Sequence, residues 1–152
     1  MLKIKLSDID LDSFDIVLNK AGRVVDGINH GRIVLNGDDI YYKIFDKEYC
    51  RRENFIKALE AGFFDEVAPA LQSLIEDDGE IVGYTMKAGE TLDEIPFHFY
   101  QRILSLAKEK KMFFYDLVPI NIIKTKSGKL SLIDLSSLYD LDEPVTYTHI
   151  RA

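Results

Sequence analysis

The stretch that most constrains the fold runs from residue 113 to residue 136, because it places polar side chains among strongly apolar neighbours. Asp116, Asn121 and Asp134 each have an aromatic or aliphatic residue on both sides. A carboxylate or carboxamide in such surroundings costs free energy unless it is well hydrogen-bonded or takes part in chemistry. Pro119 lies between the first two and disfavours a continuous helix, so we expect a loop from Asp116 to Asn121.

Two strands and a tight turn are predicted after this loop. Residues 122–125 and 130–133 are rich in β-branched and aliphatic side chains, and the Lys-Ser-Gly-Lys sequence between them is typical of a turn. The resulting hairpin returns Asp134 to the end at which Asn121 lies. Asn121 and Asp134 would then supply the hard oxygen ligands that Mg²⁺ prefers, and Asp116 would remain to orient a hydroxyl group or accept its proton.

This stretch resembles the catalytic core of the protein-kinase-like superfamily. The sequence from Asp116 to Asn121 matches the catalytic loop H-R-D-x-x-x-x-N from its aspartate onward, and Asp134 matches the aspartate of the metal-binding D-F-G. Phe114-Tyr115 replaces the His-Arg pair, and Leu135-Ser136 replaces Phe-Gly. This pattern is closer to atypical kinases and to small-molecule and lipopolysaccharide kinases than to ordinary protein kinases.

Lys43 is the next candidate, in a strand predicted for residues 39–45. Alternation places Tyr41, Lys43 and Phe45 on one face of that strand. The sequence resembles the kinase strand whose lysine contacts the α- and β-phosphates of ATP and pairs with a helix glutamate. Without the resemblance, Lys43 is interpreted as an exposed lysine on an edge strand.

A helix is predicted for residues 46–64 from the spacing of its apolar side chains. Glu53 and Glu60 are seven residues apart and lie on nearly the same helix face, so either is a partner for Lys43. The resemblance to the corresponding helix of small-molecule kinases favours Glu53. The alternative is a local ion pair between Glu53 and Lys57.

The resemblance implies two further contacts with the nucleotide. Gly22 occupies the place of the glycine-rich loop above the ATP phosphates, although the G-x-G-x-x-G pattern is absent, and its alternative is an ordinary hairpin turn. Tyr84, Thr85 and Met86 occupy the place of the hinge, where backbone groups would hydrogen-bond to the adenine. Without the resemblance, Tyr84 is a core aromatic residue.

These patterns predict an α+β fold, specifically a minimal protein-kinase-like fold in a single domain over residues 1–152. Residues 1–88 would form an N-terminal antiparallel sheet with one helix. Residues 89–152 would form a reduced C-terminal lobe with one main helix, over residues 96–111, and the catalytic-loop hairpin. A length of 152 residues with 47% hydrophobic side chains suits one compact core. Further strands are predicted at residues 1–6, 13–18, 32–35, 70–75 and 80–86.

Charge and cysteine content exclude several classes of function. A formal net charge of -7 without blocks of like charge argues against binding to nucleic acids or anionic membranes. Cys50 is the only cysteine, which excludes an internal disulfide and favours a reducing, cytoplasmic setting. No apolar run reaches the roughly 20 residues that span a bilayer, and the first residues lack the apolar core of a signal peptide.

The resemblance implies an ATP- and Mg²⁺-dependent kinase that transfers the γ-phosphate to a hydroxyl acceptor, with a protein Ser/Thr as one class of acceptor. The alternatives are a small-molecule, sugar or lipid kinase, an inactive pseudokinase acting as a binding module, and an unrelated α+β domain. Few residues follow Asp134, so we expect a partner protein or a second copy of the chain to cover the exposed flank. The side chains expected in that contact are Leu138, Tyr139, Leu141 and Tyr147.

Overall fold

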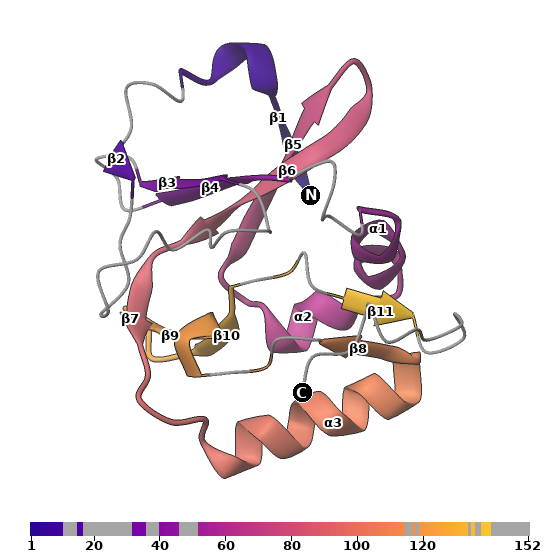
Figure 1. The fold of residues 1–152 in the computed structure, drawn as a ribbon, viewed down its shortest axis with the longest axis vertical. Coiled ribbons are helices and arrows are strands. Elements are labelled where there is room, and N and C mark those ends of the chain that lie inside the picture. The colour runs from indigo at the N-terminus through magenta and orange to yellow at the C-terminus, as the bar shows by residue number, and fades with distance from the viewer. Residues whose placement is uncertain are drawn as a thin grey trace.

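The computed structural model of the chain describes residues 1–10, 15–16, 32–35, 40–45, 52–114, 117, 119–133, 135 and 138–140. These residues form a mixed α+β fold, as predicted. Figure 1 shows a larger sheet at one end of the molecule and two smaller sheets with the longest helix at the other. Of the described helices, none is both long and apolar enough to cross a membrane.

The larger sheet has six strands in the order β1-β5-β6-β4-β3-β2, so β6 is an interior strand between β5 and β4. Neighbouring strands are antiparallel except β1 and β5, which run parallel. The predicted antiparallel sheet is therefore mixed at this edge, where no hairpin dictates the direction of β1. The strand bounds are β1 Leu2–Lys5, β2 Asp15–Ile16, β3 Arg32–Leu35, β4 Ile40–Ile44, β5 Leu71–Asp77 and β6 Glu80–Lys87.

Two helices take the place of the single helix predicted for residues 46–64. They are α1, Arg52–Glu60, and α2, Phe63–Val67, and residues 46–51 lie outside the described part of the chain. Gly62 separates them in a left-handed conformation with φ of 74°. Glycine adopts this conformation without steric cost, and it commonly ends a helix.

The other end of the molecule contains α3, Phe97–Lys110, close to its predicted bounds. The predicted hairpin is confirmed as β9, Ile122–Thr125, and β10, Leu130–Leu132, with Ile122 opposite Leu132. β7, Gly89–Thr91, joins β9 in the same three-stranded sheet. β8, Met112–Phe114, pairs antiparallel with β11, Leu138–Asp140.

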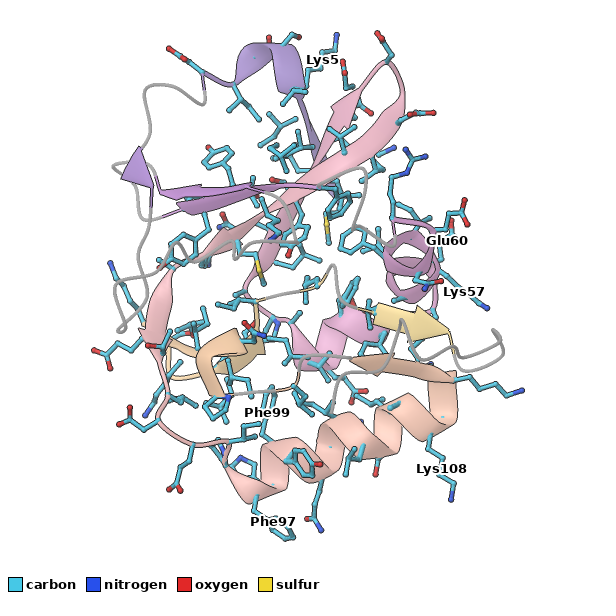
Figure 2. All side chains as sticks on the ribbon, viewed as in Figure 1. Lys5, Lys57, Glu60, Phe97, Phe99 and Lys108 are labelled. Atoms are coloured by element: carbon cyan, nitrogen blue, oxygen red, sulfur yellow. The ribbon has the colours of Figure 1, made fainter. Side chains whose placement is uncertain are left out.

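One hydrophobic cluster runs through both ends of the molecule. In its aromatic part, Phe55 of α1 stacks on Tyr84 of β6 with ring centroids 5.3 Å apart and meets Phe45 edge-on at 5.1 Å. Phe99 of α3 points into the same cluster, whereas Phe97 points away from it (Figure 2). The shared core therefore packs the larger sheet, through α1 and α2, onto the elements that include the β9–β10 hairpin.

Candidate functional site

Asn121 ends a short 3-10 helix, Pro119–Asn121, that leads directly into β9. The N–H of Ile133 donates a hydrogen bond to the Asn121 carbonyl oxygen at 2.9 Å. This bond extends the β9–β10 ladder one residue pair beyond Ile122 and Leu132. The chain therefore returns to Asn121 just before residue 134, as the hairpin pattern predicts. Asp116 and Asp134 themselves lie outside the described residues.

Lys43 lies in β4, an interior strand flanked by β3 and β6, and its side chain is only 2% exposed. Phe45, two residues further along the strand, is also buried, as the predicted alternation requires. The alternative interpretation of Lys43 as an exposed lysine on an edge strand is therefore wrong. A lysine is seldom buried to this extent without a compensating interaction, which makes Lys43 a candidate functional residue.

Tyr84 is the residue opposite Lys43 in the β4–β6 register, and directly opposed residues project from the same face of a sheet. Its hydroxyl donates a hydrogen bond to the carbonyl oxygen of Ile133 and accepts one from the N–H of Leu135, both at 3.0 Å. These two residues flank position 134. Tyr84, the cross-strand neighbour of Lys43, is thus hydrogen-bonded to the backbone on both sides of position 134.

The acidic residues of α1 face solvent, whereas Lys43 is buried. Glu53 and Glu60 are both exposed, whereas the buried face of α1 carries Asn54, Phe55 and Ala58. Figure 2 shows Glu60 on the outer side of the helix, away from the larger sheet. At 100° per residue, Glu53 lies on the same outer side. The apolar side chains determine the rotation of the helix, and they turn both predicted partners of Lys43 toward solvent.

Asn54 is a buried polar residue that the sequence interpretation missed. Its side-chain amide donates a hydrogen bond to the carbonyl oxygen of Leu138 at 3.0 Å, and Asn54 is 5% exposed. The bond links α1 to β11, the strand that follows position 134. The signal that would have identified Asn54 is its position next to Phe55, on the face of the helix that carries the apolar side chains.

Leu138 was expected to contact a partner, but it is fully buried within the chain. Its strand, β11, pairs with β8, and the Asn54 side chain donates a hydrogen bond to its carbonyl oxygen. Nothing in the described structure tests Tyr139 in that role, because its side chain is not described, and Leu141 and Tyr147 lie outside the described residues.

We expect Asn54→Leu to lower the free energy of unfolding by about 1–3 kcal/mol, because the Leu138 carbonyl would lose its donor in a buried place. Leucine has a higher helix propensity than asparagine, so a loss would not come from the helix itself. Urea denaturation measures the difference. Glu60→Gln on the exposed side of α1 is the matched control, and equal stability of the two variants would contradict the prediction.

The predicted hinge residues lie inside the larger sheet. Tyr84, Thr85 and Met86 are buried in β6, and β4 and β5 pair with this strand on its two sides. The Thr85 hydroxyl is hydrogen-bonded to that of Ser73. The connection out of the sheet begins later, at Ala88, where the chain passes from β6 into β7. The structure thus places these three residues before the connection, because β6 extends to Lys87.

The structure brings Lys43 and Tyr84 together, and through Ile133 it joins Tyr84 to Asn121. Gly22 lies outside the described residues. Within the described part of the chain, no group of three or more His, Cys, Asp or Glu residues is placed to hold a metal ion.

No protein-family model matches the chain, and a search of the curated proteins also found no match. The function is therefore inferred from the residues and their arrangement.

Proposed function

We propose that the chain is a minimal kinase-like phosphotransferase that binds ATP with Mg²⁺ and transfers the γ-phosphate to a hydroxyl acceptor. The observation that carries this proposal is the buried pair of Lys43 and Tyr84, in which the lysine lies beside the tyrosine that holds both neighbours of position 134. A cationic group on β4 and the backbone around the proposed metal-binding aspartate are thereby joined through Tyr84 of the neighbouring strand β6.

The arrangement of elements supports a kinase-like fold. The lysine strand β4 lies next to β6, the strand that runs into the connection between the two ends of the molecule. The helix α3 comes before the loop at Asn121, and the β9–β10 hairpin follows it and leads to position 134. These are the elements that the resemblance implies for an N-terminal sheet, a main C-terminal helix and a catalytic-loop hairpin.

Phosphoryl transfer asks a protein mainly to position reactants and to stabilise charge. In this proposal, Lys43 positions the α- and β-phosphates, and its low exposure strengthens its field because little water screens it. Asp116 orients the acceptor hydroxyl and takes its proton.

The metal ligands would be Asn121 and Asp134. The residues fit Mg²⁺, which prefers a few protein oxygens and keeps water and phosphate oxygens as its other ligands. Asn121 is half-buried at the end of the loop, beside the returning strand. Bound Mg²⁺ would neutralise charge on the phosphates during transfer.

A second candidate is a catalytically inactive module with the same fold. The position of Glu53 favours this candidate, because the predicted helix glutamate is exposed whereas Lys43 is buried. Within the active alternative, the role of Asp116 is the same for a protein Ser/Thr, a sugar, a lipid headgroup or another small hydroxyl compound. Acceptor screening with radiolabelled ATP would separate these classes.

Calorimetric titration of ATP with and without Mg²⁺ tests the nucleotide site. We expect Mg²⁺ to tighten ATP binding to the unmodified protein, and Asp134→Ala to weaken the Mg²⁺-dependent binding by at least about tenfold, because a charged ligand of the metal is lost. Asp77→Ala removes an exposed carboxylate at the end of β5 and is the control. An unchanged Mg²⁺ dependence in Asp134→Ala would refute the metal assignment, and no ATP binding by the unmodified protein would refute the proposed function.

A further inference from the structure

The hydroxyl of Tyr84 makes two hydrogen bonds that span a single residue. It donates to the carbonyl oxygen of Ile133 and accepts from the N–H of Leu135, both at 3.0 Å. All three residues are buried, so water does not readily replace either bond. A buried carbonyl or N–H group that loses its partner costs free energy, and the hydroxyl satisfies one of each kind.

The two backbone groups held by Tyr84 belong to the peptide units on either side of residue 134. Each peptide unit is planar and rigid, so a unit whose carbonyl or N–H bond is fixed in direction can rotate only about that bond. The φ and ψ angles of residue 134 are the rotations that relate these two planes. A hydroxyl that holds both planes would therefore restrict these two angles, and with them the direction of the Cα–Cβ bond.

The Tyr84 ring is itself held in place by neighbouring rings. Phe55 of α1 stacks on it with a centroid distance of 5.3 Å and an interplanar angle of 14°, and Phe45 lies 5.7 Å away. A side chain locked by packing holds its polar group more accurately than a mobile one. The packing therefore fixes the position of the Tyr84 hydroxyl relative to the larger sheet. The same sheet carries Lys43, the residue opposite Tyr84.

We propose that Tyr84 is a positioning residue for Asp134, whose hydroxyl sets the direction in which residue 134 presents its carboxylate. This inference rests on the proposed function, in which Asp134 is a ligand of Mg²⁺. It gives the larger sheet two roles, because the same pair of strands carries the phosphate-binding lysine and aligns the metal-binding aspartate. Tyr84 would then act through the backbone rather than by contact with the adenine.

Tyr84→Phe tests the proposal, because it deletes the hydroxyl and keeps the ring that packs on Phe55. In calorimetric titrations, we expect ATP binding in the presence of Mg²⁺ to weaken by about tenfold, as when a residue that orients a metal ligand is lost, and ATP binding without Mg²⁺ to stay unchanged. A purely structural role would not separate these two affinities. Ser73→Ala is the control, because it removes a buried hydroxyl on β5 that bonds to Thr85 and not to the backbone near position 134.

Amide hydrogen exchange of Leu135, followed by NMR, tests the hydrogen bonds independently of any ligand. We expect its N–H to exchange at least about tenfold faster in Tyr84→Phe than in Ser73→Ala, because only the first variant removes its acceptor. An unchanged exchange rate of the Leu135 N–H would show that the Tyr84 hydroxyl does not restrain this backbone group, and would overturn the proposal. Faster exchange with an unaltered Mg²⁺ effect on ATP binding would overturn the positioning role. If Mg²⁺ did not affect ATP binding to the unmodified protein, the proposed function would be refuted. The positioning role of Tyr84, which rests on that function, would then be refuted with it.

Discussion

Replacing Lys43 with methionine is expected to reduce ATP turnover by about 10²–10³-fold, the usual effect of removing one preorganised charge-stabilising group. Lys43 is 2% exposed in the interior strand β4, so its charge acts where water screens it little. Methionine has a similar length and fills irregular space well, but it carries no charge. The substitution would therefore remove the proposed phosphate contact and leave most of the packing.

ADP release at saturating Mg²⁺ measures this effect, and calorimetry gives the accompanying loss of ATP affinity. Lys3→Met is the matched control, because Lys3 is exposed in the same sheet, at the edge strand β1. Circular dichroism of both variants checks that the sheet is retained. Turnover by Lys43→Met equal to that of Lys3→Met would show that Lys43 has a structural role only.

Gly83→Ala is expected to lower the free energy of unfolding by about 3 kcal/mol, at the upper end of the usual cost of overpacking a core. A Cβ atom at Gly83 would lie 2.1 Å from the Lys43 carbonyl oxygen and 3.1 Å from the carbonyl carbon of Lys43. These are backbone atoms, so no side chain can rotate to make room. Gly83 also pairs with Ile44 on one side and Ile75 on the other, which prevents β6 from moving away from β4.

Guanidinium denaturation of Gly83→Ala measures this cost. Gly79→Ala is the matched control at the turn between β5 and β6, where a Cβ would meet no atom within 4 Å. Its left-handed φ of 81° still costs alanine about 1 kcal/mol. A loss of stability in Gly83→Ala no larger than in Gly79→Ala would mean that β4 and β6 separate without cost. Because the contact lies at the backbone of Lys43, the same variant should also weaken ATP binding.

Local patterns in the sequence predicted many of the elements correctly. The alternation around Lys43 placed Lys43 and Phe45 on one face of β4, where both are buried, and the turn sequence before Leu130 identified the β9–β10 hairpin. The helical spacing after Pro96 identified α3. Each of these features depends on residues close together in the chain, where side-chain periodicity and turn chemistry act directly. Gly62 divides the predicted first helix because its left-handed conformation ends the helix whatever the apolar spacing indicates.

By itself, the sequence determined the candidate residues, the hairpin that returns the chain to Asn121 and the α+β class. Only the tertiary structure decided that Glu53 faces solvent, that Asn54 reaches Leu138 and that the Tyr84 hydroxyl holds Ile133 and Leu135. These three outcomes depend on how α1 rotates against the sheet and on contacts between residues about 50 to 84 positions apart. Periodicity predicts whether a side chain faces the core or solvent. The hydrogen-bond partner of a buried polar group depends instead on which distant elements pack together.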